Sequence, residues 1–258
     1  MRRTLWGALL FLGIGAASAH AECPNDMLTT VTGKKECIVI HTFAPSADGP
    51  PKLVIFLHGD QSDGGPVVYT IKVAGAVAVP PGTIKVAVLR PGYGDEQGNK
   101  STGENYNRRD SYTGANIDEI AAVINALKMR YRPTQTVIVG HSGGAAYAGV
   151  LIGRHPGIAD GVVLLSCPCD IDRWRQSGYA WVRSLSPNKF VGSVPQGTRV
   201  LALTGTNDMN TSYTLAEAYV KLLKDRGVDA EFQAVADADH NGTLSGRVIA
   251  PALARLLQ

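Results

Sequence analysis

The stretch Gly140-His141-Ser142-Gly143-Gly144 places a serine among glycines, where an apolar run ends and a run of small residues begins. A serine on a sharp turn between a strand and a helix exposes its hydroxyl above the sheet edge, and nearby glycines avoid side-chain clashes there. The N-terminal end of the following helix stabilises negative charge. The pattern predicts that Ser142 is a nucleophile. The alternative is a serine in a glycine-rich turn without chemistry.

A serine hydroxyl is a poor nucleophile on its own, so a base and an orienting acid must lie within hydrogen-bond range. Two histidines follow Ser142. His155 follows a predicted helix and is interpreted as a surface residue, whereas His240 lies in a loop rich in turn-forming residues after the last predicted strand. His240 is therefore the predicted base, and Asp208, directly after another strand, is the predicted acid. The competing acids lie on the His240 loop or in an insertion: Asp170, Asp172, Asp237 and Asp239.

Acyl transfer also needs N–H donors for the oxyanion that develops on the substrate. The backbone N–H of Gly143 is the first candidate. The second comes from the loop after the strand 53–57, where the N–H of Asp60 is preferred and that of Gln61 is the alternative. A carboxylate beside an oxyanion is unfavourable, so this prediction requires the Asp60 side chain to point away. His58 is interpreted as a residue that structures the loop.

These residues need a framework, and the sequence alternates strand-like runs, loops with glycine, and helical patterns. The predicted strands cover residues 37–43, 53–57, 84–89, 136–139, 161–165, 199–203 and 230–235. The predicted helices cover residues 115–130, 144–154, 215–225 and 244–257. This alternation predicts a doubly wound, mostly parallel α/β sheet with helices on both faces. Sites in such sheets form beyond the carboxyl ends of the strands, which is where the candidate residues lie.

In these features the sequence resembles the α/β-hydrolase superfamily. The resemblance covers nearly all of the chain after residue 21 and depends on His58-Gly59, the motif at 140–144, Asp208 and His240. Residues 90–94 also resemble a loop that rims the site in many members. The resemblance implies a serine nucleophile, a histidine that acts as base and then acid, and no need for a metal or organic cofactor. The sequence looks closest to dienelactone-hydrolase-like or peptidase-like esterases, with serine where the former have cysteine.

Residues 1–21 are predicted to be an export signal. Two arginines precede an apolar run from Leu5 to Ala17, and small residues follow. The run is shorter than the roughly 20 residues that span a bilayer as a helix, and an uncleaved anchor is the alternative. Cleavage after Ala19 or Ala21 fits the small residues, and cleavage after Ala21 is preferred. The sequence thus predicts a periplasmic or secreted protein with no stable membrane insertion after cleavage.

Residues 22–258 are long enough for one α/β-hydrolase domain with a substantial core. Removal of the signal lowers the formal charge from +3 to +1, and no basic stripe is visible, which argues against nucleic acid as a partner. Residues 167–195 interrupt the alternation and are predicted to form a small insertion or cap. The candidate substrate-binding aromatic residues are Tyr93, Trp174, Tyr179 and Trp181. For Trp174, Tyr179 and Trp181, which belong to the insertion, the alternative role is to pack it onto the domain.

Four cysteines are compatible with disulfides in an exported protein, and three pairings are possible. The pair Cys23 and Cys37 is preferred because it would tie down the N-terminal end of the domain. For Cys167 and Cys169, a bridge and two free thiols are both open, because a bridge would close a tight ring. Cys167 and Cys169 could supply two metal ligands, but no second pair of ligands lies nearby in the sequence, so no zinc site is predicted.

The sequence therefore predicts an exported serine hydrolase that cleaves a carboxylic ester, or a related acyl bond, in a small molecule. A serine peptidase or acyltransferase would use the same residues, and a peptidase would need a charge to anchor a peptide terminus. Arg173, Arg175 or Arg183 could supply it. A non-catalytic binding protein of the same fold is the alternative from another class. The acyl group, the leaving group, the oligomeric state and any lid motion stay open.

Overall fold

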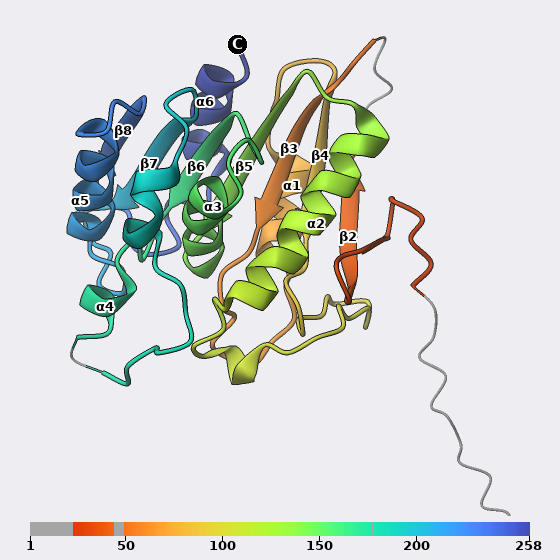
Figure 1. Ribbon diagram of the computed structural model, residues 1–258, viewed down its shortest axis with the longest axis horizontal. Coiled ribbons are helices and arrows are strands. Elements are labelled where there is room, and N and C mark those ends of the chain that lie inside the picture. Colours follow the sequence, from red (N-terminus) through yellow and green to blue (C-terminus); the bar gives the residue numbers. More distant parts are fainter. Residues whose placement is uncertain (1–22, 44–48, 177) are drawn as a thin grey trace, which may run out of the picture.

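The computed structural model describes residues 23–43, 49–176 and 178–258, and these form an eight-stranded sheet with helices on both faces (Figure 1). The strand order is β1-β2-β4-β3-β5-β6-β7-β8. The strands from β4 to β8 along this order are parallel, whereas β1 and β2 form an antiparallel edge. The predicted doubly wound α/β sheet is confirmed. The predicted export signal, residues 1–21, lies outside the described residues.

Most strands lie where apolar runs predicted them. They are β1 (Thr30–Thr32), β2 (Cys37–Phe43), β3 (Lys52–Leu57), β4 (Thr83–Val88), β5 (Gln135–His141), β6 (Gly161–Leu165), β7 (Arg199–Gly205) and β8 (Ala230–Val235). The predicted bounds of β2, β6 and β8 are the observed ones. Strand β1 was not predicted, and because it pairs with the start of β2 it forms an N-terminal hairpin.

The helices divide between the two faces of the sheet. They are α1 (Tyr69–Ala76), α2 (Gly114–Tyr131), α3 (Gly143–Arg154), the short α4 (Ile171–Trp174), α5 (Tyr213–Lys224) and α6 (Gly246–Leu256). Successive strand residues point to opposite faces. Within β3, Leu53 and Ile55 share a core with α2, α3 and α5, while Val54 and Phe56 share the other core with α1 and α6. Both faces of the central strands are therefore buried.

The strand registers bring the candidate loops to one edge of the sheet. Leu57 at the end of β3 pairs with Gly140 of β5, and His141 at the end of β5 pairs with Leu165 of β6. Leu165 in turn pairs with Leu203 near the end of β7. Because these strands are parallel, the loops that follow them leave the sheet on the same side, which is where the site residues gather.

The predicted insertion, residues 167–195, has two parts. Its second part is a 3₁₀ helix, Pro187–Ser193, which packs against α3. An added Cβ at Gly149 would lie 2.9 Å from a carbon of Pro187, so the small residues of α3 permit this close contact. Its first part contains α4 and overhangs the carboxyl edge of the sheet (Figure 1).

Both cysteine pairs are bridged. The preferred pairing of Cys23 with Cys37 is present and links the N-terminal end of the described chain to β2. Cys167 and Cys169, for which the sequence left two states open, form the second disulfide. This bridge lies just after β6, and both of its cysteines are fully buried.

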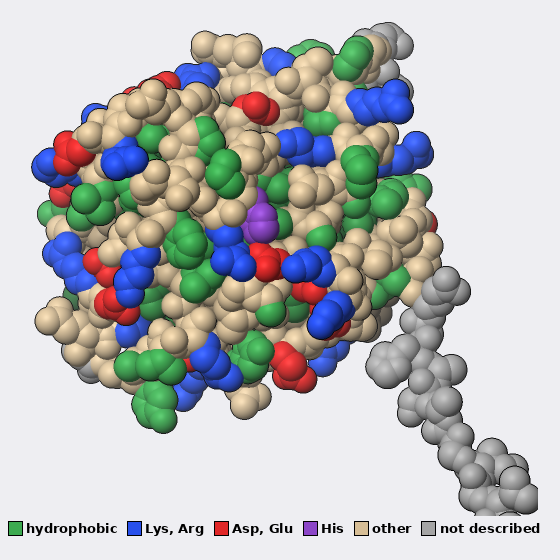
Figure 2. All heavy atoms as spheres, in the orientation of Figure 1, with side chains coloured by type: hydrophobic (Ala, Val, Ile, Leu, Met, Phe, Trp, Pro, Cys, Tyr) green, Lys and Arg blue, Asp and Glu red, His purple; other side chains and the backbone are tan. Residues whose placement is uncertain are grey.

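The surface in Figure 2 mixes acidic and basic side chains, and a histidine is visible near the middle of the face drawn. In the described part of the chain, no helix combines the length and the apolar character that crossing a membrane requires.

Candidate active site

Ser142 lies on a sharp turn between β5 and α3. Its backbone has φ 53° and ψ −118°, an unfavourable region for a residue with a side chain. The turn is held because the Ser142 N–H donates to the Leu165 carbonyl at 2.9 Å, and the Ser142 carbonyl accepts from Ala145 and Ala146 in the first turn of α3. The serine is thus fixed at the carboxyl end of β5, in the strained geometry that its motif predicts.

Glycines make this turn possible because backbone segments cross it closely. An added Cβ at Gly140 would lie 2.7 Å from the Cα of Ala145, and one at Gly144 would lie 2.7 Å from the carbonyl oxygen of His58. At Gly59 it would lie 3.2 Å from the Cβ of Ser142. The loop after β3 and the start of α3 therefore touch each other on either side of the serine.

The structure brings His240 and Asp208 together from different loops. The Nδ1 atom of His240 lies 2.9 Å from Oδ2 and 3.1 Å from Oδ1 of Asp208. Asp208 also accepts hydrogen bonds from the N–H of Thr211 at 2.8 Å and that of Asn210 at 2.9 Å. Burial by itself raises the pKa of Asp208, but the hydrogen bonds from His240 and Thr211 outweigh it and lower the pKa to about 2.

Ser142 and His240 line the same cleft, which has a volume of about 730 Å³. No hydrogen bond joins the two side chains in the described chain. Such contacts are often long without substrate and tighten when it binds. The competing acids lie elsewhere: Asp170 caps α4, and Asp239 accepts from the N–H groups of its own turn. His155 pairs with Asp118 on the surface, as its sequence position predicts.

A second histidine, His141, supports the His240 loop. Its Nε2 lies 2.9 Å from the His240 carbonyl oxygen, and its Nδ1 lies 3.3 Å from the Tyr69 hydroxyl. Since the Gly59 N–H donates to Tyr69 at 2.7 Å, the phenol is free to donate onward to Nδ1. This assigns the proton of His141 to Nε2. Burial lowers the pKa of His141 to about 4.

A buried ion pair lies beneath the serine. Asp60 accepts from Nη2 of Arg90 at 2.8 Å and from the Tyr112 hydroxyl at 2.6 Å, and Arg90 also donates to the Gly59 carbonyl at 2.7 Å. Burial, followed by the nearby Asp60 charge, raises the pKa of Tyr112 well above its usual value, so this phenol keeps its proton. The Asp60 carboxylate is thus directed to two donors. It nevertheless lies close to Gly143, where an added Cβ would be 2.5 Å from its Oδ1.

The rest of the loop after β3 is also fixed. Nε2 of His58 accepts from the Arg90 N–H at 3.0 Å, so its Nδ1–H donates to the Gly59 carbonyl. Burial and the Arg90 charge lower the pKa of His58 well below its usual value, which keeps the ring neutral. His58 therefore structures the loop. Gln61, the alternative donor residue, has φ 50° and lines the cleft.

The four predicted wall residues lie in different places, and Tyr179 is exposed and does not line the cleft. Trp174 lines the cleft. Tyr93 is 1% exposed and packs edge-on against His58, and Trp181 is 8% exposed and packs against Tyr112 and Trp174. Neither Tyr93 nor Trp181 is among the residues that line the cleft in the described chain. The prediction that residues 90–94 rim the site is corrected, because Arg90 and Tyr93 turn inward to their buried partners.

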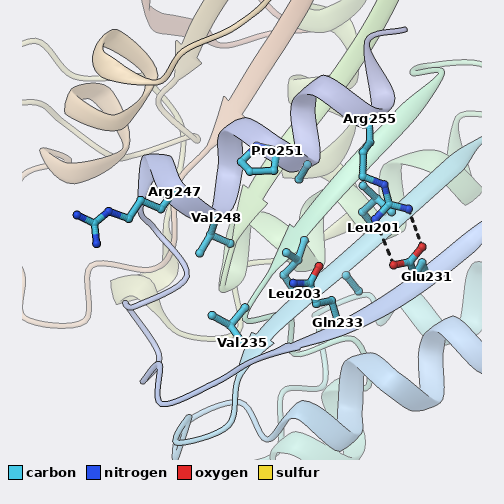
Figure 3. A pocket seen from close by; sticks show the side chains of 11 residues that line it. Leu201, Leu203, Glu231, Gln233, Val235, Arg247, Val248, Pro251 and Arg255 are labelled. Atoms are coloured by element: carbon cyan, nitrogen blue, oxygen red, sulfur yellow. Dashed lines mark hydrogen bonds and ion pairs between the residues drawn. The ribbon is translucent and has the colours of Figure 1, made fainter.

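A second hollow, of about 140 Å³, lies between α6 and the strands β7 and β8 (Figure 3). Leu201, Leu203 and Val248 form its apolar wall, and an ion pair between Arg255 and Glu231 closes one end. It shares no lining residue with the cleft at Ser142. The described residues contain no cluster of three or more histidine, cysteine or acidic side chains that could hold a metal ion.

A family profile described as "Alpha/beta hydrolase family" matches residues 54–239, which include Ser142 and Asp208 and end one residue before His240. This chain belongs to the α/β hydrolase family. No curated protein sequence matches it.

Several solved structures share this α/β-hydrolase fold. The esterase Est1E of Butyrivibrio proteoclasticus, with ferulic acid bound, has 16% identity and a TM-score of 0.67, over 88% of this chain and 97% of that chain. The Pyrococcus furiosus esterase Pf2001 has 15% identity and a TM-score of 0.67, over 88% of each chain. A puromycin-hydrolyzing peptidase of Mycobacterium tuberculosis has 17% identity and a TM-score of 0.62, over 85% of this chain and 36% of that chain. At these identities the likeness shows the fold alone.

Sequence reasoning missed several residues of this α/β-hydrolase site. Ser166 donates to the His240 carbonyl at 2.9 Å, and Thr211 donates to Asp208 at 2.8 Å. Ser166 directly follows β6, and that position was the available signal, whereas Thr211 lies further along the loop between β7 and α5. Tyr69 belongs to α1, a helix that was not predicted, so nothing in the sequence pointed to its contact with His141.

The buried state of His141 predicts a pH dependence of stability. The unfolded chain binds a proton at the ordinary pKa of 6.5, whereas the folded chain binds it only at about 4. More protons are bound by the unfolded state between these values, so the free energy of unfolding falls as the pH decreases. Between pH 7 and pH 4 we expect the free energy of unfolding to fall by about 3 kcal/mol more in the wild type than in His141→Gln.

Urea unfolding of both proteins at pH 4, 5, 6 and 7 measures this difference. Glutamine is chosen because its amide N–H keeps a donor for the His240 carbonyl. The contribution of His58 is the same in both proteins and cancels. Equal losses in the two proteins would show that His141 is not held neutral by burial.

Proposed function

We propose that this α/β hydrolase is a serine hydrolase that cleaves a carboxylic ester through a Ser142-His240-Asp208 triad and an acyl-enzyme. The observation that carries the proposal is the shared cleft: a strained serine at a strand end and a histidine whose Nδ1 is held by a buried carboxylate. A scaffold that only binds a partner has no chemical need for this arrangement. The substrate is a small molecule with an ester or related acyl bond.

In the proposed reaction the Ser142 hydroxyl attacks the ester carbonyl, and Nε2 of His240 takes its proton. Asp208 accepts the Nδ1–H hydrogen bond, which places the free lone pair on Nε2 and stabilises the imidazolium that forms. The tetrahedral intermediate collapses as Nε2 gives the proton to the leaving alcohol. A water, activated by the same nitrogen, then releases the acid from Ser142.

The oxyanion of the tetrahedral intermediate needs two donors. Gly143 is the first residue of α3, so its N–H has no acceptor inside the helix and lies at the positive end of the helix dipole. The N–H of Asp60, or that of Gln61 next to it, is the second donor. The Asp60 carboxylate would oppose this role if it were free, and its pairing with Arg90 and Tyr112 removes that objection.

The place of action is proposed to be outside the cytoplasm, in the periplasm or beyond the cell. Both disulfides are consistent with an oxidising compartment, and the N-terminal sequence has the pattern of an export signal. The overhanging residues of the segment 167–195 are proposed to form a small cap at the cleft, because Trp174 and Arg175 contribute to its wall.

A fluorophosphonate probe tests the nucleophile directly. We expect stoichiometric labelling of Ser142 at pH 8, located by peptide mass mapping and accompanied by hydrolysis of short-chain nitrophenyl esters. His240→Ala should abolish both, whereas His155→Ala, which removes a surface histidine paired with Asp118, should preserve them. A folded protein that takes up no label would support the non-catalytic alternative. A nitroanilide with the same acyl group separates peptidase from esterase activity.

A further inference from the structure

Arg175 follows α4 and lines the cleft that contains Ser142 and His240. It is the one arginine or lysine among the described residues that form the cleft wall. Its side chain is half-buried, so its charge is only partly exposed to bulk solvent.

Two tryptophans contact this guanidinium, and their rings lie at 74° to each other. The Cζ atom of Arg175 lies 3.5 Å from the ring centroid of Trp174 and 4.4 Å from that of Trp181. Trp174 is fixed in turn because its indole N–H donates to the Asn210 carbonyl at 2.8 Å, and Trp181 packs edge-on against Tyr112. Cation–π contacts of this kind hold the guanidinium next to the rings without giving its N–H groups an oxygen acceptor.

Those donors are not used by the described protein. The Arg175 side chain makes no hydrogen bond or ion pair with any described residue, and its Nε is buried without a partner. Arg108 is engaged with backbone carbonyls of the loop after β3. Arg90 also has an Nε and an Nη1 without a partner, but it is fully buried, is paired with Asp60, and does not line the cleft. A buried donor without a partner costs free energy, so a fixed arginine of this kind fits a ligand that completes it.

The other charges at the cleft do not supply that partner. Asp60 is already paired with Arg90, and Asp208 with His240. Asp63 lies on the cleft wall and accepts from the Gly65 N–H, but it forms no ion pair with Arg175. An anionic group that enters the cleft therefore meets one cation without a counter-ion, in the same cleft as the proposed nucleophile.

We infer that Arg175 binds a carboxylate carried by the substrate, so that the preferred substrates are esters with a free carboxylate on the acyl or the alcohol part. A carboxylate matches the in-plane pair of N–H groups of a guanidinium, and such charge-assisted pairs are stronger than neutral hydrogen bonds. This inference rests on the proposed function and narrows its substrate class. Arg175 would act as a specificity residue, apart from the triad.

Matched esters test the inference. The mono-4-nitrophenyl ester of glutaric acid and 4-nitrophenyl valerate have acyl chains of the same length, with and without a carboxylate. The 4-carboxyphenyl and 4-carbamoylphenyl esters of valeric acid compare a carboxylate with an amide on the leaving group. For at least one pair, the wild type is expected to have a higher kcat/KM for the charged ester than for the neutral one.

Arg175→Gln should lower the charged-to-neutral ratio of kcat/KM by about 10- to 100-fold, mainly by raising KM for the charged ester.

Two further variants sharpen the comparison. Arg175→Lys keeps the charge but loses the planar pair of donors, so its ratio should lie between those of the wild type and Arg175→Gln. Arg173→Gln removes an exposed arginine two residues away that donates to Thr214 and does not line the cleft. It should leave the ratio unchanged. An Arg175→Gln ratio equal to that of the wild type for both pairs would overturn the inference and leave the proposed hydrolase intact.

Binding separates the two proposals if no ester is cleaved. Calorimetric titration of Ser142→Ala with the mono-4-nitrophenyl ester of glutaric acid should show binding that Arg175→Gln, introduced into the same protein, weakens at least about tenfold. Such binding without hydrolysis by the wild type would refute the catalytic proposal and support the carboxylate site. Hydrolysis of neutral esters together with equal binding by both proteins would refute the carboxylate site alone.

Discussion

Replacement of Asp208 by asparagine is expected to lower kcat for ester hydrolysis by about 10⁴-fold, with a much smaller change in KM. Asp208 accepts the hydrogen bond from Nδ1 of His240 at 2.9 Å. An asparagine can present its NH₂ group to that nitrogen, which then becomes the acceptor. The ring proton then lies on Nε2, the nitrogen whose lone pair must accept the proton of Ser142. The variant therefore keeps the side-chain shape but holds the histidine in the wrong tautomer.

The effect should persist across the pH range in which the protein is stable. Hydrogen bonds from His240 and Thr211 overcome the opposing effect of burial and lower the pKa of Asp208 to about 2. The carboxylate of the wild type is therefore ionised at every pH from about 4 upward. Raising the pH cannot supply the missing charge in the variant, so the ratio of wild-type to variant kcat between pH 5 and pH 9 is expected to show no rescue.

Asp237→Asn is the matched control. Asp237 lies on the same loop as His240 and has φ 56°, a conformation that asparagine tolerates well. We expect its kcat to stay within a few-fold of the wild type. If Asp208→Asn retained more than a tenth of wild-type kcat, or Asp237→Asn lost as much activity as Asp208→Asn, the assignment of the acid would be wrong.

Most strands and helices were predicted from the sequence because the patterns that indicate them are local. Central strands covered on both faces are continuous apolar runs, and the bounds predicted for Gly161–Leu165 and Ala230–Val235 are the observed ones. The helix Tyr69–Ala76 was missed: it is short, begins without a side-chain cap, and contains β-branched residues and an interior glycine. Its position depends on packing against the sheet, which no local pattern records.

The candidate site was partly predictable for a related reason. Ser142, Asp208 and His240 all follow strands, and parallel strands end at one edge, so strand-end placement was enough to select them. The direction of a side chain in a loop depends on partners far away in the sequence. Tyr93 follows a strand in the same way, but it turns into the protein against His58 and the Arg90 guanidinium.

Arg90 is the clearest case of information that the sequence does not carry. Arginine is almost never fully buried unless it is paired, so its position after a strand favoured an exposed rim. In the fold it is fully buried, with Tyr93 and Tyr147 each 4.8 Å from its Cζ and Asp60 as its counter-ion. The counter-ion lies 30 residues earlier in the chain, so the pair becomes visible only when β3 and β4 are side by side.

Arg90→Met is therefore expected to be the most destabilising of these substitutions. It removes the positive partner of Asp60 and leaves a buried carboxylate with only the Tyr112 hydroxyl to satisfy it. Breaking a buried pair in this way costs about 3–5 kcal/mol of unfolding free energy. Urea unfolding measures the loss, and circular dichroism at low urea establishes that the variant is folded.

The same variant should lose most of its esterase activity even where it is folded. Without Arg90, the Gly59 carbonyl loses one of its two donors and the Asp60 charge beside Gly143 is no longer balanced. A free negative charge there opposes the oxyanion that Gly143 and Asp60 are proposed to stabilise. The fall should appear in kcat, because the charge acts on the transition state more than on the neutral ester.

The double variant Asp60→Asn/Arg90→Met separates charge from packing. It removes both charges together, and a buried ion pair can often be replaced by uncharged groups at little cost, so it should be more stable than Arg90→Met alone. If the single and double variants unfold at the same urea concentration, the ion pair does not account for the loss of stability in Arg90→Met.

A recovery of stability with only partial recovery of kcat would show that the pair acts in two ways. Its charge balance would keep the domain folded, and the hydrogen bond from Arg90 to Gly59 would hold the oxyanion loop against the serine turn.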